Sequence, residues 1–195
     1  MKMPSSLKII RDEHSSLAAM LQSMRLLVRQ GPRESRNSFF DVVRAMLFYI
    51  DEYPERLHHP KESNLLFPKV AKAAPKVMGA IDRLERDHMY SENAARELQH
   101  QLLAWELLGP SRREVFEQAF EQYVKFYLDH MSLEESVILP EAERVLSEQD
   151  WAQLDAEFEK NADPLTGHYP APAEYEKLFS LIVSRAPAPI GLGQG

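Results

Sequence analysis

Hydrophobic residues recur every three or four positions along most of the chain, which is the spacing of one face of an α-helix. Four such stripes cover residues 7–28, 40–65, 81–105 and 116–137. Gly-Pro or Ala-Pro pairs, which are typical of helix ends, separate the stripes at positions 31–32, 74–75 and 109–110. Four long amphipathic helices with short connections predict an all-α fold, an antiparallel up-down four-helix bundle.

Proline and polar residues divide the chain further. Pro54 and Pro60 fall inside the second stripe, so we expect a kink or an interruption near His58. After the fourth stripe, two shorter helices are predicted, one from Ser147-Glu148 to Phe158 and one over residues 173–185. We therefore expect a bundle over residues 1–146, a helical extension packed on it over 147–186, and an extended or mobile tail over 187–195.

Composition and charge exclude several classes of function. The chain has 195 residues, and 23 Lys and Arg against 30 Asp and Glu give a net charge of −7 with no basic cluster, so a nucleic-acid or anionic-membrane partner is not expected. It has no cysteine, which excludes disulfides, thiolate zinc sites and iron–sulfur clusters. No signal peptide or long apolar run is evident, which predicts a cytoplasmic protein. The sequence allows a homodimer.

Six polar residues fall on the otherwise apolar stripes, and they are arranged as a repeat. Each half of the chain has one histidine, then a His-x-x-x-Glu motif, and a proline follows each motif's histidine by ten positions. The six residues are His14, His58, Glu62, His88, His130 and Glu134.

The spacing of these residues points to metal binding. Residues four positions apart lie on one face of a helix, so a histidine and a glutamate there can hold one ion together. A single histidine on an apolar face is more often a core residue, but four of them in a repeat with two glutamates favour a metal site. Four imidazoles and two carboxylates suit iron or manganese, zinc less obviously, and magnesium or calcium poorly. Two divalent ions there would keep excess positive charge, which a bridging oxide, hydroxide or carboxylate would offset.

The sequence resembles hemerythrin-like proteins of the HHE cation-binding kind over roughly residues 1–146. The resemblance rests on His14, on HHPKESNLLFP (58–68), on ERDH (85–88) and on HMSLEES (130–136). It implies a four-helix bundle with a non-haem diiron centre that reacts with O₂, NO or peroxide. The six residues above match the family's ligands, and the two irons would be oxo- or hydroxo-bridged, with manganese or zinc as alternatives in the purified protein.

Two positions depart from the oxygen carriers of this family. Those proteins place a second histidine one turn after the third-helix histidine, where this chain has Glu92. They also place an acid five residues after the fourth-helix histidine, where this chain has Glu135 beside Glu134. A site one histidine short would keep an open coordination position or recruit Glu92, and either Glu134 or Glu135 can serve as the bridge.

Several neighbours of the motif residues have weaker claims. His59 is expected beside the site or at the surface, and its replacement of His58 as ligand is the alternative. Tyr127 is expected in the core with a hydrogen-bonded hydroxyl rather than as a ligand. Glu13 and Asp87 are expected on the solvated helix face, and a role in orienting ligands is the alternative. His100 and His168 lack a partner pattern and are expected at the surface.

Three classes of function remain open from the sequence, and whether the protein is an enzyme is undecided. One is a protein that binds or senses O₂ or NO, or handles iron. A second is an enzyme that decomposes peroxide or repairs iron centres, which a missing histidine would favour. A third is a structural metal site, such as zinc, with the C-terminal helices as an interaction surface.

Overall fold

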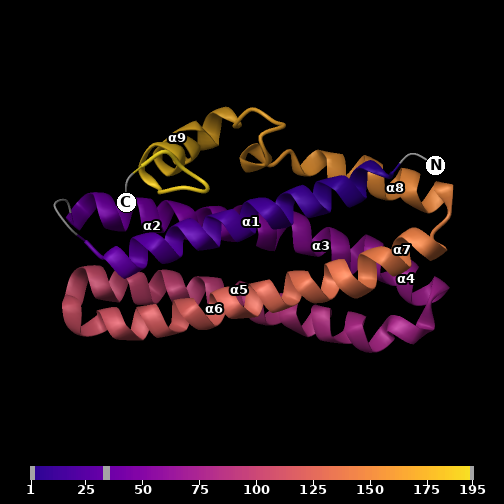
Figure 1. Cartoon of the computed structure of the whole chain (residues 1–195), viewed down its shortest axis with the longest axis horizontal. Coiled ribbons are helices and arrows are strands. Elements are labelled where there is room, and N and C mark those ends of the chain that lie inside the picture. Colours follow the sequence, from indigo (N-terminus) through magenta and orange to yellow (C-terminus); the bar gives the residue numbers. More distant parts are fainter. Residues whose placement is uncertain (1–2, 33–35, 194–195) are drawn as a thin grey trace.

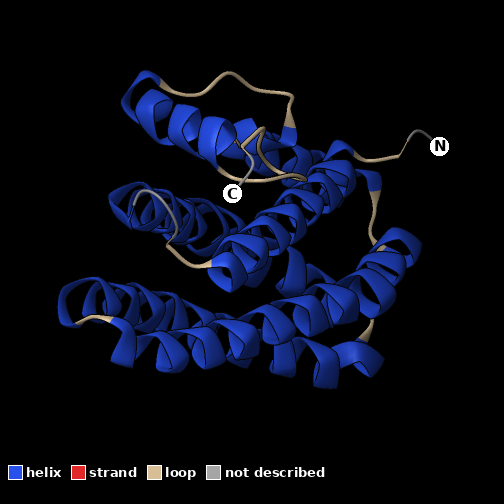
Figure 2. Cartoon of the chain, turned by 60° about the vertical axis from the view of Figure 1, so that its left-hand side comes forward, coloured by secondary structure: helices blue, strands red, loops and turns tan. Residues whose placement is uncertain are grey.

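The computed structural model describes residues 3–32 and 36–193, which are mostly helical, joined by loops, and contain no strand (Figure 2). The all-α fold class is therefore confirmed. The α-helices are α1 (Ser5–Gln30), α2 (Arg36–Ile50), α3 (His59–Lys61), α4 (Phe67–Ala73), α5 (Met78–Leu108), α6 (Arg113–Leu133), α7 (Leu139–Val145), α8 (Glu148–Phe158) and α9 (Glu176–Arg185).

Wider and tighter helical turns connect several of these helices without a break. The π-helical segments, in which hydrogen bonds span five residues, are η1 (Asp51–His58), η2 (Glu62–Leu66) and η5 (Glu134–Ile138). The 3₁₀ turns are η3 (Pro75–Val77), η4 (Pro110–Arg112), η6 (Glu159–Asn161), η7 (Pro164–Thr166) and η8 (Ala173–Tyr175). The chain thus stays helical from α2 to α4, and Pro54 and Pro60 lie within a continuous helical path.

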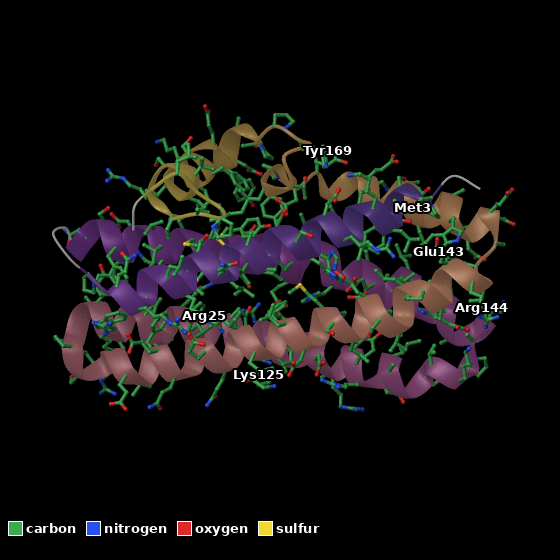
Figure 3. The ribbon with its side chains drawn as sticks, viewed as in Figure 1. Met3, Arg25, Lys125, Glu143, Arg144 and Tyr169 are labelled. Carbon is green, nitrogen blue, oxygen red and sulfur yellow. The ribbon has the colours of Figure 1, made fainter. Side chains whose placement is uncertain are left out.

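The long helices pack in a ring. Helix α1 contacts α2, α2 contacts α5, α5 contacts α6, and α6 contacts α1, while α4 contacts α7 at the end of the molecule that is on the right in Figure 1. Arg25, which is labelled in Figure 3, extends from α1. Its Nη2 lies 2.9 Å from Oε2 of Glu121 of α6. Helices α8 and α9 lie outside this ring, on α1 and on α2 respectively (Figure 1).

A polar layer separates two hydrophobic cores. One core takes residues of α1, α2, α5 and α6 together with Phe179 and Ile182 of α9. The other core takes the beginnings of α1 and α5, helices α4 and α7, and Trp151, Leu154 and Phe158 of α8. The six motif histidines and glutamates fall between the two cores along each long helix. The extension therefore contributes one helix to each core.

Local signals set several helix boundaries as expected. Gly31 and Gly109, at φ of 70° and 92°, end α1 and α5, and their N–H groups donate to the carbonyls of Leu27 and Trp105. Ser147 caps α8 through a reciprocal pair of hydrogen bonds with Asp150. No described helix is both long and apolar enough to cross a membrane. The division at residues 146 and 186 stays a prediction, and residues 1–2, 33–35 and 194–195 within it lie outside the described residues.

The described part of the tail folds back rather than extending. Pro187 and Gly193 form an isolated bridge, and the N–H of Ile190 donates to Ser23 Oγ of α1 at 3.0 Å. Ile190 packs on the core, whereas Leu192 is 86% exposed. A Cβ on Gly193 would stand 2.1 Å from the carbonyl oxygen of Arg185, so glycine is required for this close approach.

Candidate metal centre

Two groups of buried side chains in the polar layer bring metal-binding atoms together. Within each group, one ligand atom per residue lies within 4.8 Å of all the others. The first group is His14, His58, Glu62 and Glu134, and the second is His59, Glu62, His88 and His130. All six residues of the sequence motif are therefore brought together, and the structure adds His59.

Glu62 belongs to both groups because its two carboxylate oxygens face different histidines. Its Oε1 lies 2.8 Å from Nε2 of His58 in the first group, and its Oε2 lies 3.4 Å from Nε2 of His88 in the second. Glu134 faces the first group, with Oε2 3.3 Å from Nε2 of His14. Glu62 thus has the geometry of a carboxylate that bridges two ions.

The π-helical segments explain how the adjacent residues His58 and His59 both face the centre. A π turn holds one residue more than an α turn, which rotates neighbouring side chains relative to the regular pattern. The N–H of His59 donates to the carbonyl of Pro54, and that of Phe67 donates to the carbonyl of Glu62, both five residues back. Glu62 and Glu134 each begin such a segment.

His59 supplies a third histidine to the second group, where the sequence predicts Glu92 or an open coordination position. Its ring stacks on that of His88 at 4.1 Å between centroids. Glu92 is 52% exposed in its side chain and pairs with Arg96 at 2.6 Å, away from the centre. His58 and His59 belong to different groups, so the arrangement does not favour His59 as a substitute for His58.

Four of the five imidazoles share one arrangement, with Nδ1 facing outward to a polar partner. Such partners fix the tautomer and leave Nε2 for a metal ion. The partners are Glu135 for His14 at 2.9 Å, Glu13 for His58 at 2.6 Å, Glu55 for His59 at 3.0 Å and Ser63 for His88 at 2.9 Å. Asp87 lies 3.6 Å from Nδ1 of His130, which is too long for a hydrogen bond.

The inward atoms of the two groups provide a test of whether metal ions fit. Nε2 of His58, His88 and His130 and all four carboxylate oxygens of Glu62 and Glu134 are buried and make no hydrogen bond within the described structure. Burying a carboxylate without such a partner costs several kcal/mol. Metal ions between these atoms would satisfy them all, so the residues fit a two-metal centre.

Burial and neighbouring charges shift the pKa values of these groups in opposite directions. Burial, with the charges of nearby histidines, lowers the pKa of His59 and brings that of His130 to about 3, so both are neutral. Burial also lowers the pKa of His14, but the hydrogen bonds and charges of Glu134 and Glu135 outweigh this effect, and the pKa rises to about 9. Burial and the neighbouring Glu62 raise the pKa of Glu134 to about 7. Metal binding must displace the protons held here.

The family comparison agrees with this geometry. Residues 5–142 match the model of the hemerythrin HHE cation binding domain, which is well over half of the chain. The chain belongs to the hemerythrin HHE family. An uncharacterized protein of Haemophilus influenzae is 34% identical over 95 residues, or 49% of this chain. The match spans 53% of that relative. Membership in the hemerythrin HHE family and the two groups together indicate metal binding.

Several expectations about the neighbours are corrected in this hemerythrin HHE domain. Glu13 is 8% exposed and contacts His58, so it is not on a solvated face. Asp87 likewise lies near His130. Tyr127 is in the core as expected, where its hydroxyl donates to Glu55. Glu55 itself was not singled out from the sequence, although it precedes His59 by four residues as a helical partner would.

The remaining candidates lie away from both groups. Glu135 binds Nδ1 of His14 from the outer side, whereas Glu134 belongs to the first group, so the structure favours Glu134 as the inner acid. His100 is exposed, and His168 pairs with Asp12 at 3.2 Å on the surface of α1.

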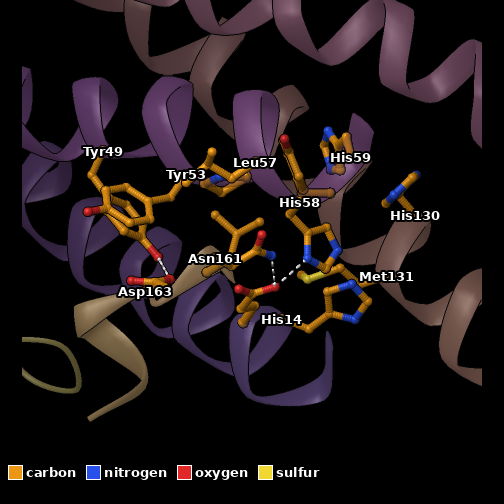
Figure 4. A pocket seen from close by; sticks show the side chains of 14 residues that line it. His14, Tyr49, Tyr53, Leu57, His58, His59, His130, Met131, Asn161 and Asp163 are labelled. Atoms are coloured by element: carbon orange, nitrogen blue, oxygen red, sulfur yellow. Dashed lines mark hydrogen bonds and ion pairs between the residues drawn. The ribbon is translucent and has the colours of Figure 1, made fainter. Parts of the chain in front are cut away.

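A small cavity adjoins the centre of this hemerythrin HHE domain (Figure 4). Histidines of both groups form one end of it, and Tyr49 and Tyr53 form the other. Leu17, Leu57 and Met131 add apolar walls. The space open to the centre of a water-sized sphere is about 10 Å³, which is close to the least that a single water needs.

Proposed function

We propose that this protein holds two iron ions in the polar layer and uses them to bind O₂ or NO, as a binding, sensing or iron-handling protein. The observation that carries the proposal is the pair of buried groups that share Glu62. The first group would hold one ion and the second group the other, and Glu62 would contribute to both.

The donor set supports iron as the metal. Five imidazoles and two carboxylates form a mixed nitrogen and oxygen environment that suits iron or manganese better than magnesium or calcium. The outer partners at Nδ1 hold the imidazoles in the orientation that ligation requires. Iron bound here would supply reversible coordination of a small molecule. Manganese or zinc are the alternatives in protein purified without added iron.

The cavity supports a diatomic ligand. It adjoins His58, His59 and His130, and its size of about 10 Å³, measured for the centre of a water-sized sphere, is close to the least that one water-sized molecule needs. Leu17, Leu57 and Met131 provide apolar walls, which favour an uncharged molecule over an ion. These residues would exclude bulk water and hold O₂ or NO beside the ions.

The two other functions have weaker support. An enzyme that decomposes peroxide or repairs iron centres is favoured by a site with one histidine fewer than the oxygen carriers. With His59, the two groups contain five histidines, so this argument is weaker. A structural zinc site does not account for a cavity beside the ligands. We also propose that the ring of helices is an antiparallel four-helix bundle. Cytoplasmic localisation and a homodimer stay predictions.

The test is metal content and an optical spectrum of protein loaded with Fe²⁺ without oxygen and then exposed to O₂ or NO. We expect about two irons per chain and a spectral change that reverses when the gas is removed. Steady O₂ release from hydrogen peroxide would instead support the enzyme. Failure to take up iron, with tight binding of zinc and no redox activity, would contradict the proposal and favour a structural site.

A further inference from the structure

The segment that joins α8 to α9 crosses the polar layer. Helix α8 packs in one hydrophobic core and α9 in the other, so residues 159–166, which include η6 and η7, pass over the metal-binding groups between them. This segment lies outside residues 5–142, which match the family. Two of its polar side chains, Asn161 and Asp163, are only 4% and 3% exposed (Figure 4).

Asn161 reaches the metal centre through Glu13. Its Nδ2 donates to Glu13 Oε2 at 3.1 Å, and the same oxygen accepts the Nδ1–H of His58 at 2.6 Å (Figure 4). The orientation of the amide is fixed because Lys61 Nζ donates to Asn161 Oδ1 and to the carbonyl of Glu157. The amide oxygen must face the ammonium group, which leaves the amide nitrogen for Glu13.

The backbone around Asn161 is strained in a way that the contacts explain. Ala162 has a φ of 45°, a left-handed conformation that costs a residue with a Cβ roughly 1–2 kcal/mol. On its other side, Asp163 accepts hydrogen bonds from the hydroxyl of Tyr49 at 2.6 Å and from the N–H of Leu165 at 2.9 Å. Strained conformations persist where their surroundings determine them, and here two buried side chains flank the strained residue and point inward.

We propose that Asn161 is a positioning residue of the metal centre, which acts on His58 through Glu13. This rests on the proposed function. By holding the Glu13 carboxylate, Asn161 fixes the Nδ1–H tautomer of His58 and aims its Nε2 at the first group. The outer partners of His59, His88 and His14 are Glu55, Ser63 and Glu135, which all come from the family-matched region. Nδ1 of His130 has no hydrogen-bond partner among the described residues. His58 is therefore the histidine through which the C-terminal extension controls the centre.

The experiment measures the affinity of the full chain for Fe²⁺ without oxygen, by competition with a chelator. Replacing a partner of a ligating histidine weakens binding about 10–100-fold, and Asn161 acts one contact further away, so Asn161→Ala should weaken it by about tenfold. Asn161→Asp keeps the shape of the side chain and its contact with Lys61. It replaces the amide N–H that faces Glu13 with a carboxylate oxygen, which cannot donate, so we expect a similar loss of affinity. The matched control is Asn93→Ala, at an exposed asparagine that bonds only its own helix.

A double-mutant cycle separates positioning from a general structural effect. In the Glu13→Ala background, Asn161→Ala should change the affinity less than about twofold, because its target is gone. Full additivity of the two losses would overturn the inference, as would wild-type affinity in both Asn161 variants. If the wild type itself binds no iron, the proposed function fails and the inference with it.

Discussion

His58 and His59 are adjacent in the chain, yet they belong to different groups of metal-binding side chains. His58 joins His14, and His59 joins His88 and His130. Each also has its own outer carboxylate, Glu13 for His58 and Glu55 for His59. The junction between η1 and α3 therefore supplies a histidine to each group, and this relationship leads to the first prediction.

Replacing His59 should remove one ion and leave the other. His59→Ala takes one of three histidines from the second group and none from the first, so we expect the content to fall from about two irons per chain to about one. Metal analysis of the loaded protein measures this. His100→Ala, which removes an exposed histidine, is the control. Unchanged content and affinity in His59→Ala would show that His59 is not a ligand.

The two glutamates should differ in their effects. Glu62 belongs to both groups and Glu134 to the first alone, so Glu62→Ala should weaken the binding of both ions and Glu134→Ala mainly that of one. We expect a loss of at least about 100-fold for each ion that loses a ligand, which exceeds the effect of outer partners. Metal titration followed by absorbance resolves the two steps. Equal effects of the two variants would argue against a bridging Glu62.

Removing the metal should lower the stability of the folded chain. The carboxylates of Glu62 and Glu134 are buried without hydrogen-bond partners, and an ion that binds only the folded state stabilises it by mass action. At an ion concentration of 100 times the dissociation constant, each site contributes about 2.7 kcal/mol. Thermal unfolding of loaded and chelator-treated protein measures the difference. Identical midpoints would mean that the ions bind elsewhere or not at all.

Filling the cavity should block the small ligand while sparing the metal. Leu17 is 3% exposed and lines the cavity, so Leu17→Phe adds volume where about one small molecule fits. We expect iron content to stay at the wild-type level while NO binding slows by at least tenfold. Leu21→Phe overpacks the same helix one turn further on without lining the cavity, and NO should bind to it as to the wild type. Normal NO binding in Leu17→Phe would exclude the cavity as the ligand site.

Asp163 should make stability depend on pH. Burial raises the pKa of its carboxyl to about 6, despite the hydrogen bond from Tyr49. A carboxyl with a raised pKa holds its proton more tightly when folded, so its contribution to stability is full below about pH 4 and falls as the pH rises to 6. The loss is roughly 3 kcal/mol at 1.36 kcal/mol per pKa unit.

The Asp163→Asn variant isolates this effect. The free energy of unfolding is measured with denaturant on metal-free protein. Between pH 4 and pH 7 it should decrease less for Asp163→Asn than for the wild type. The exposed Asp129→Asn variant is the control. Parallel pH curves for wild type and Asp163→Asn would show that Asp163 does not titrate in this range.

The sequence predicts the helices and the six motif residues because both depend on local spacing. Gly31 and Gly109 end helices where the pattern says they should, and His58 and Glu62 lie on one face four positions apart. The second histidine of the pair, His59, is not predictable from regular periodicity, because adjacent side chains in an α-helix point about 100° apart. The prolines indicated a break in the helix rather than a wider turn.

Other parts of the centre have no local signal at all. Asn161 contacts Glu13 across 148 positions of sequence, and that contact exists because the extension folds over α1. Glu13 precedes His14 in sequence, and the helical pattern places it on the solvated face. In the structure the extension covers that face, and Glu13 is buried. Glu55 differs from these residues, because it lies four positions before His59. The same four-residue spacing that identifies Glu62 also predicts this contact.

The π-helical segments have a second consequence, which concerns the direction in which the helix faces. Ile50 and Val70 are both fully buried, one in each hydrophobic core, and twenty positions separate them. In a regular α-helix those twenty positions would leave the two side chains about 200° apart, on nearly opposite sides. Segments η1 and η2 lie between them and take up this excess rotation. The turns that aim the ligands therefore also keep the apolar face in phase from one end of the molecule to the other.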